Sequence, residues 1–250
     1  MTTGLFIVFE GGDGAGKTTQ AAWLAAALDA AGVPNVSTFE PGATWLGRRV
    51  RDLVLNPASG AICPAAEALL YIADKAQHVA EVVAPALAAG AVVVSDRYTD
   101  SVIAYQGAGR ELDDALIEHI ASWATGYVTP DLTVLLDADP DDAVTAIEAK
   151  DRLEGAGLAL HRRARQRFID LARRHPERYL VLPAKDEVEN IASAVRERLA
   201  TLGVELSVPP SMMFKHENNH FPEDTPADQT GSLQHPAADQ VAGHQIQDDS

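Results

Sequence analysis

Cysteine is almost absent from this chain: Cys63 is the only one in 250 residues. A single cysteine excludes an intrachain disulfide and a metal site built from several thiolates, so we expect a reducing compartment. Long hydrophobic runs are also missing. The apolar run at residues 5–9 is too short to span a membrane, and it lacks the basic flank and cleavage site of a signal peptide. These features predict a cytoplasmic protein that binds no membrane.

Positive charge is scarce as well. The sequence has 20 Lys and Arg against 36 Asp and Glu, a formal net charge of −16. Residues 205–250 hold eight of the acids and one base, which leaves 28 acids against 19 bases, or −9, in the remainder. Nucleic-acid affinity comes from clustered Lys and Arg, so this balance argues against nucleic-acid binding. Any phosphate ligand must be met by a local basic pocket.

Short apolar segments alternate with longer segments of helical spacing. The expected strands are residues 5–9, 35–39, 91–95, 132–137 and 179–182. The expected helices are residues 18–31, 65–89, 113–125, 141–149, 158–174 and 187–202. This alternation predicts an α/β fold in which helices flank a five-stranded parallel sheet on both faces.

Ligands of such sheets bind at the carboxyl ends of the strands. We therefore expect the segments that follow the first four strands to line one crevice, namely residues 10–18, 40–44 and 96–98 and Asp137.

The composition changes near Ser207, after which Pro, Asn and Gln dominate and apolar residues follow no period. Such a segment cannot bury enough surface to offset the entropy of ordering it. We predict one domain at residues 1–204 and a disordered acidic tail at residues 205–250. Four histidines of the tail are spaced by 4, 15 and 9 residues, which fits no compact metal site.

Residues 11–18 read Gly-Gly-Asp-Gly-Ala-Gly-Lys-Thr, a complete G-x-x-x-x-G-K-[ST] loop between a strand and a helix. Its glycines let backbone N–H groups surround a phosphate, and the helix N-terminus adds a favourable dipole. Lys17 can reach the β and γ phosphates, and the Thr18 hydroxyl can ligate Mg²⁺. The alternative is a Gly-rich turn without a ligand. The predicted nucleotide-binding residues of the loop are Gly11, Gly12, Asp13, Gly14, Ala15, Gly16, Lys17 and Thr18.

A phosphate-binding loop alone does not define a reaction, because switches, motors and kinases all use it. Asp96 and Arg97 directly follow the third expected strand. The carboxylate can hold Mg²⁺ or its waters, and the guanidinium suits bidentate phosphate binding. This pair favours phosphoryl transfer. The alternative for Arg97 is a surface ion pair with Asp96 or Asp100.

Six separated segments together resemble the bacterial thymidylate kinases, a family of P-loop nucleoside monophosphate kinases. The segments are residues 11–19, 40–42, 66–78, 96–98, 104–110 and 151–154, within a resemblance that spans roughly residues 4–203. The resemblance implies transfer of the γ-phosphoryl group of ATP to dTMP with Mg²⁺, which gives dTDP and ADP. It also implies a homodimer.

The family's roles transfer to matching positions of this sequence. The resemblance implies catalytic roles for Asp13, Lys17, Arg97 and Arg152, with Lys150 and Arg152 on a mobile lid over ATP. It implies acceptor-binding roles for Glu40, Tyr71, Lys75, Arg97, Ser101, Tyr105 and Gln106. It implies Mg²⁺ ligation by Thr18 and Asp96.

Local chemistry fits two of these assignments. Tyr71 lies four residues before Lys75, so one helix face offers a ring that can stack on a pyrimidine and a cation that can reach its carbonyl oxygen. A core Tyr beside a snorkelling Lys is the alternative. Asp13 would repel phosphates unless a cation balances it, and Arg97 is the candidate.

The chain also departs from the family pattern. The substituted positions are Phe39, Ala43, Arg48, Lys75 and Val102, of which Lys75 lacks the planar fork of the usual Arg. The Arg- and Gly-rich lid stretch is replaced by residues 146–150, so we expect weaker catalysis. Further along, residues 162–167 carry four arginines at mixed angles, namely Arg162, Arg163, Arg165 and Arg167, which we interpret as a solvated face.

Two alternative functions remain open at this stage. One is a kinase of the same architecture for another nucleotide or nucleoside. The other is a nucleotide-binding regulator that has lost turnover, which the departures support. Against the second stands the presence of the groups that phosphoryl transfer needs, namely Lys17, Thr18, Asp96 and Arg97.

Overall fold

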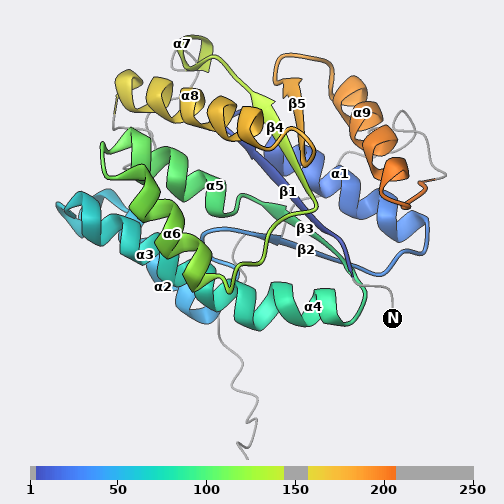
Figure 1. The fold of residues 1–250 in the computed structure, drawn as a ribbon, viewed down its shortest axis with the longest axis horizontal. Helices are drawn as coiled ribbons and strands as arrows, with labels where there is room; N and C mark the ends of the chain where they lie inside the picture. The colour runs from blue at the N-terminus through green and yellow to red at the C-terminus, as the bar shows by residue number, and fades with distance from the viewer. Residues whose placement is uncertain (1–3, 144–156, 207–250) are drawn as a thin grey trace, which may run out of the picture. The chain divides into compact units, whose positions relative to one another are not determined.

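The computed structural model describes residues 4–143 and 157–206 (Figure 1). Its centre is a five-stranded sheet of order β2-β3-β1-β4-β5 in which every neighbouring pair is parallel. The strands are β1 (Phe6–Gly11), β2 (Asn35–Phe39), β3 (Val92–Asp96), β4 (Leu132–Asp137) and β5 (Tyr179–Pro183). The predicted α/β class and the five predicted strands are confirmed.

The three central strands are buried on both faces, which explains their largely apolar sequences. All of β1 is buried, as are Val92–Ser95 of β3 and Leu132–Leu136 of β4. Because helices cover both faces, neither face needs polar residues at alternate positions. The polar residues appear instead at the carboxyl ends, where Glu10, Asp96 and Asp137 stand.

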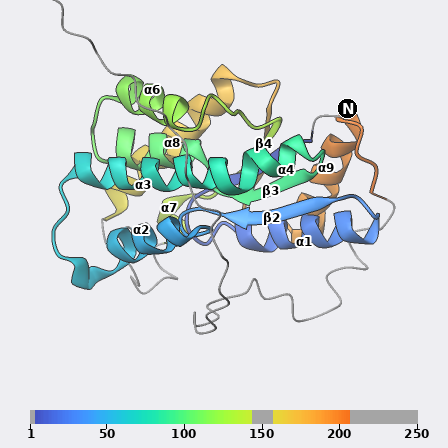
Figure 2. The same cartoon turned by 90° about the horizontal axis from the view of Figure 1, so that it is seen from below.

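Helices form a layer on each face of the sheet (Figures 1 and 2). Contacts place α1 and α9 on one face and α4, α5 and α8 on the other, with α3 and α6 packed against α5. The α-helices are α1 (Lys17–Ala30), α2 (Trp45–Leu55), α3 (Pro64–His78), α4 (Ala84–Ala88), α5 (Thr99–Val102), α6 (Asp114–Ala124), α7 (Pro140–Ala143), α8 (Leu158–Arg174) and α9 (Val188–Thr201). A 3-10 helix, η1 (Pro57–Ser59), and two π-helices, η2 (Val79–Val83) and η3 (Ile103–Gly109), complete the set.

The structure differs from the sequence prediction in its helices. The single helix expected at residues 65–89 contains the π-helix η2 between α3 and α4. Helix α2 was not predicted, although Thr44 caps it by accepting a hydrogen bond from Gly47 N at 2.9 Å. Its buried residues Val50 and Val54 have helical spacing, which was the available signal. The continuous segment α5–η3 was also missed.

Two sequence predictions fall outside the described residues. Only α7 of the helix expected at residues 141–149 is described, and the tail predicted at residues 205–250 lies beyond the described part from residue 207 onward. Within residues 4–143 and 157–206, no helix is long and apolar enough to cross a membrane.

Candidate active site

The loop between β1 and α1 depends on glycine at its two ends. A Cβ at Gly11, where φ is 138°, would lie 2.3 Å from the carbonyl oxygen of Leu136 on β4. Gly16 precedes the first residue of α1 and has a φ of 88°, which favours glycine. The tight turn therefore brings the N-terminus of α1 to the carboxyl edge of the sheet, where its dipole favours an anion.

Lys17 and Thr18 begin α1 and face different partners. The Lys17 Nζ atom donates to the Gly12 carbonyl oxygen at 2.6 Å, so its charge lies within the loop. Burial, together with the charge of Arg97, lowers the pKa of Lys17 to about 8. The Thr18 hydroxyl donates to Asp96 Oδ2 at 2.5 Å across from β3.

The arrangement at Asp96 fits a hard cation. Its second carboxylate oxygen, Oδ1, is buried and has no hydrogen-bond partner among the described residues. An orphaned buried oxygen beside a threonine hydroxyl is a combination that Mg²⁺ or its waters would satisfy, since Mg²⁺ prefers oxygen ligands.

Arg97 joins the phosphate-binding loop to the segment after β3. Its backbone is left-handed, with a φ of 73°, a conformation that a non-Gly residue adopts only when its surroundings impose it. Its Nη2 atom pairs with Asp13 Oδ1, and its Nη1 atom donates to Ser101 Oγ at 3.1 Å and to the Gly11 carbonyl oxygen at 3.3 Å. Arg97 therefore pairs with Asp13, as the charge argument predicted, and not with Asp96 or Asp100.

The electrostatics of Asp13 follow from this pairing. Burial would raise the pKa of Asp13, but the charges of Arg97 and Lys17 outweigh it and lower the pKa below its ordinary value. Asp13 is thus held as an anion between two cations, at the point where the loop meets the neighbouring pocket.

Glu10 is a buried carboxyl group that the sequence analysis did not single out. It is fully buried and accepts hydrogen bonds from Tyr98 N at 2.8 Å, Ser101 N at 3.2 Å and Ser101 Oγ at 2.6 Å. It therefore holds the turn that carries Arg97 against the end of β1. Burial raises the pKa of Glu10 to about 7, and the nearby charge of Asp100 adds to the increase.

This carboxyl group makes stability depend on pH in a predictable direction. Glu10 keeps its proton up to about pH 7 in the folded state but releases it near its ordinary pKa of 4.5 when unfolded. The folded state binds more protons in that window, so stability is lost as the pH rises through it. We expect the free energy of unfolding of the wild type to fall relative to Glu10→Gln by on the order of 3 kcal/mol between pH 5 and pH 8.

Urea unfolding of both proteins at several pH values measures this difference. Glu189→Gln, which removes an exposed carboxylate, is the matched control. A difference between wild type and Glu10→Gln that stays constant across the pH range would contradict the prediction.

A pocket of about 130 Å³ lies beside the phosphate-binding loop. Its lining residues are Asp13, Glu40, Pro41, Arg51, Leu55, Tyr71, Lys75, Arg97, Ser101, Val102, Tyr105 and Gln106. The structure therefore brings together all seven residues predicted to bind the acceptor, with Asp13 at their border. Arg51 was missed because α2 was not predicted; it donates to the Pro41 carbonyl oxygen at 2.9 Å.

Asp137 is not among the lining residues of this pocket, although it also follows a strand. Arg165 of α8 donates to both of its carboxylate oxygens, at 2.6 and 3.0 Å. The remaining three of the four expected segments do contribute to the pocket, through Asp13, Glu40 and Arg97.

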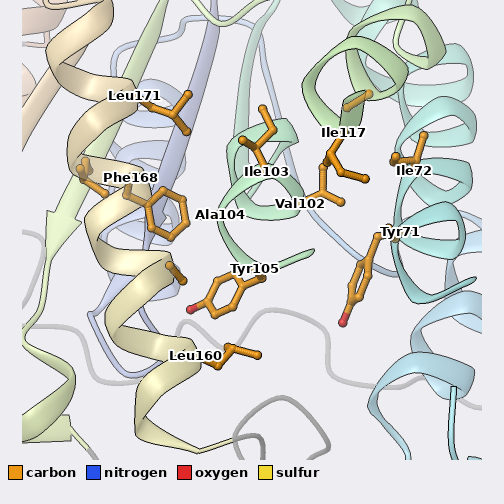
Figure 3. Close-up of a cluster of buried hydrophobic side chains, with 14 of the residues drawn as sticks. Tyr71, Ile72, Val102, Ile103, Ala104, Tyr105, Ile117, Leu160, Phe168 and Leu171 are labelled. Carbon is orange, nitrogen blue, oxygen red and sulfur yellow. The ribbon is translucent and has the colours of Figure 1, made fainter. Parts of the chain in front are cut away.

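Two buried tyrosines stand on different walls of the pocket. Figure 3 shows Tyr105 between Phe168 of α8 and the helix that carries Tyr71. The Tyr105 ring packs edge-on against the rings of Phe168 and His161, with centroids 6.0 and 6.1 Å apart, and the Arg97 guanidinium lies 5.6 Å from its centroid. This packing fixes the ring while one side still faces the pocket.

Lys75 is bound within a buried polar chain. Its Nζ atom donates to Glu40 Oε2 at 2.5 Å, His78 Nδ1 lies 2.7 Å from Glu40 Oε1, and Thr38 Oγ1 lies 2.6 Å from His78 Nε2. Burial would raise the pKa of Glu40, but the charge of Lys75 and the hydrogen bond of His78 lower it. The contacts of His78 and Thr38 were not predicted. They hold Glu40, and through it Lys75, at the pocket wall.

Known proteins are similar to this chain in sequence and in fold. The family model for thymidylate kinase matches residues 9–195. The chain belongs to the thymidylate kinase family. The thymidylate kinase of Cutibacterium acnes is 59% identical over 199 residues, which cover 80% of this chain and 98% of that protein. The thymidylate kinase of Deinococcus radiodurans is 53% identical over 205 residues, which cover 79% and 99%.

A solved structure agrees with these sequence matches. The crystal structure of thymidylate kinase from Ehrlichia chaffeensis superposes with a TM-score of 0.65 at 32% identity, and the match covers 79% of this chain and 99% of that one. The predicted resemblance to the thymidylate kinase family is thus confirmed from sequence and from fold.

The described residues leave part of the predicted thymidylate kinase lid untested. Lys150 and Arg152 lie outside the described ranges, as do residues 146–150.

The arginines of α8, by contrast, are described. Arg162 and Arg163 are exposed, as the interpretation as a solvated face predicts, but the interpretation needs correction at Arg165 and Arg167, which are only partly exposed. Arg163 donates to the carbonyl oxygens of Ala108 and Gly109, and Arg165 binds Asp137. Arg167 pairs with Asp114 at 3.0 Å. The exposed Arg162 and Arg163 are also paired, with Asp141 and Glu111. The partners of the four arginines lie on or beside η3, β4, α6 and α7, which sequence spacing along one helix could not reveal.

Proposed function

We propose that this protein transfers the γ-phosphoryl group of ATP to dTMP and so produces ADP and dTDP. The proposal rests on one observation: the phosphate-binding loop directly adjoins the neighbouring pocket. Asp13 belongs to the loop, Arg97 pairs with it, and both line the pocket. A phosphate group of an acceptor in the pocket would meet the same arginine that faces the donor.

The reaction needs positioning and charge neutralisation, with no covalent intermediate. Lys17 supplies positive charge from the loop, and Arg97 supplies it from the acceptor side. Thr18 and Asp96 would hold Mg²⁺, which when bound neutralises phosphate charge. Asp13 keeps the Arg97 guanidinium aimed at the border of the two sites.

The pocket chemistry suits a thymine nucleotide. Tyr71 offers a ring for stacking on a pyrimidine, and the Lys75 ammonium, which can only donate, suits a carbonyl oxygen of the base. Tyr105 fits the role of the residue that crowds the sugar 2′ position and favours deoxyribose.

An acceptor panel tests the proposal. The protein is given ATP and Mg²⁺ with dTMP, dUMP, the ribonucleotide of thymine, dCMP or dAMP, and ADP release is followed. We expect dTMP to be the best acceptor. Faster turnover of dCMP or dAMP would favour another nucleotide kinase, and tight ATP binding without transfer to any acceptor would favour a regulator.

We also propose that the protein is a homodimer. Five large apolar side chains are strongly exposed on α2, α3 and α6, where α3 packs against both other helices. They are Trp45 at 61%, Leu53 at 46%, Leu69 at 57%, Leu116 at 54% and Trp123 at 66% exposure. Exposed apolar side chains gathered on packed helices favour association, and a second copy of the chain would cover them.

Leu116→Glu is expected to convert the dimer into a monomer, because the carboxylate would be desolvated at the interface. Sedimentation velocity measures the change. Val181→Glu on β5, where the native side chain is 48% exposed and lies away from these helices, is the control and should leave the assembly unchanged. A monomeric wild type, or a Leu116→Glu variant that remains dimeric, would contradict the proposal.

A further inference from the structure

A partly buried ion pair between Arg110 and Glu67 lies behind one wall of the pocket. Glu67 of α3 is 1% exposed, and Arg110, which directly follows η3, donates to its two carboxylate oxygens from Nε at 3.0 Å and from Nη2 at 3.1 Å. The same carboxylate accepts a hydrogen bond from Gln106 Nε2 at 3.1 Å. Gln106 is 2% exposed and lines the pocket.

Glu67, Arg110 and Gln106 form a hydrogen-bonded triad. Its chemistry fixes the orientation of the Gln106 side-chain amide. A carboxylate can only accept hydrogen bonds and a guanidinium can only donate them. Arg110 therefore keeps Glu67 in place as an acceptor, and Glu67 can be met only by the NH₂ group of Gln106. The carbonyl oxygen of Gln106 is left for the pocket side. An isolated glutamine amide would have no such preference.

The position of the triad places this amide beside the base. Glu67, Tyr71 and Lys75 follow one another at intervals of four on α3, so they share one helix face. Tyr71 and Lys75 line the pocket together with Gln106. The wall thus offers a donor at Lys75 and an acceptor at Gln106.

We infer that Glu67 and Arg110 are positioning residues that hold the Gln106 carbonyl oxygen toward the pocket and thereby select pyrimidines that carry a hydrogen on N3. Thymine and uracil present an N3–H donor next to the O4 acceptor, whereas cytosine presents an N3 acceptor next to an amino donor. Cytosine would place its N3 acceptor against the Gln106 carbonyl oxygen, which also accepts. It would place its amino donor against the Lys75 ammonium, which also donates. The inference rests on the proposed function, because it assigns the basis of base selection at the same pocket.

Glu67→Met tests the inference, because methionine fills similar space but accepts no strong hydrogen bond. The Gln106 amide can then turn its oxygen to Arg110 and its NH₂ group to the pocket. We expect the ratio of kcat/KM for dTMP to kcat/KM for dCMP to fall roughly ten- to a hundredfold, the effect of one misdirected buried hydrogen bond. The ratio for dTMP to dUMP should not change, since these bases share the N3–H and O4 edge.

A second substitution should restore selection. In Glu67→Met/Gln106→Glu the acid is moved from position 67 to position 106, where one oxygen can accept from Arg110 and the other can face the base. A carboxylate presents an oxygen in either orientation, so we expect the double variant to regain most of the dTMP preference. Glu67→Gln, whose amide can turn either way, serves if the methionine variant does not fold, and its ratio should fall severalfold.

Other outcomes would overturn the inference. A purely structural role for Glu67 would lower activity on dTMP and dCMP equally and leave their ratio unchanged. An equal loss of the dTMP to dUMP ratio, or a double variant that stays unselective, would also contradict it. A wild type that does not prefer dTMP over dCMP would instead refute the proposed function. Calorimetric dissociation constants for dTMP and dCMP give the same comparison without turnover.

Discussion

Lys17→Ala is expected to lower kcat by roughly a hundredfold or more, with a smaller change in the KM for dTMP. The Lys17 ammonium is buried and held within the loop by the Gly12 carbonyl oxygen. Removing a preorganised charge that acts on developing phosphate charge typically costs two or more orders of magnitude in rate. Steady-state kinetics with ATP and dTMP measures the loss.

Lys185→Ala is the matched control, because Lys185 is an exposed lysine away from the pocket. It should keep wild-type kinetics. Near-normal turnover of Lys17→Ala, with folding verified by its thermal unfolding midpoint, would refute the assigned role of Lys17.

Arg97→Ala should lower kcat at least as much as Lys17→Ala does, and it should also change the KM for dTMP. Arg97 borders both the phosphate-binding loop and the acceptor pocket, so its loss should lower kcat by roughly a thousandfold and also raise the KM for dTMP. Part of the loss comes from Asp13, a mostly buried carboxyl group that would lose its main partner.

A second variant at position 97 separates charge from geometry, and a variant at position 162 is the control. Arg97→Lys keeps the charge but loses the planar fork, so its kcat should lie between those of the wild type and Arg97→Ala. Arg162→Ala removes an exposed arginine paired with Asp141 and should change neither constant. An Arg97→Ala variant that altered only KM would show that Arg97 binds the acceptor without stabilising the transition state.

Much of the site was predictable because its signals are local. The phosphate-binding loop is contiguous, and its glycines have the positions that a tight turn requires. Tyr71 and Lys75 are four residues apart on a helix that the periodicity revealed. The central strands were visible because their buried sequences are largely apolar, and the rule for parallel sheets then placed Asp13, Glu40 and Arg97 at one edge.

The supporting residues could not be predicted because their partners are distant in the chain. Glu10 holds Ser101, His78 holds Glu40, and Glu67 holds Gln106. Each contact joins segments more than thirty residues apart, and no periodicity or motif encodes which buried acid meets which donor. Arg51 shares this difficulty, since its place at the pocket depends on the unpredicted helix α2.

The π-helix η3 makes the length of its segment matter more than its composition. Tyr105 and Gln106 lie within η3, and Arg110 comes directly after it. A π-helix bonds residue i to residue i+5, so it accommodates about one residue more per turn than an α-helix. A one-residue deletion that returns η3 to α-helical winding would therefore leave Arg110 close to its present direction. An insertion would instead turn the residues beyond it by about 100° and take Arg110 away from Glu67, even if every side chain were kept. We therefore expect this stretch to tolerate single substitutions, or a one-residue deletion, better than an insertion.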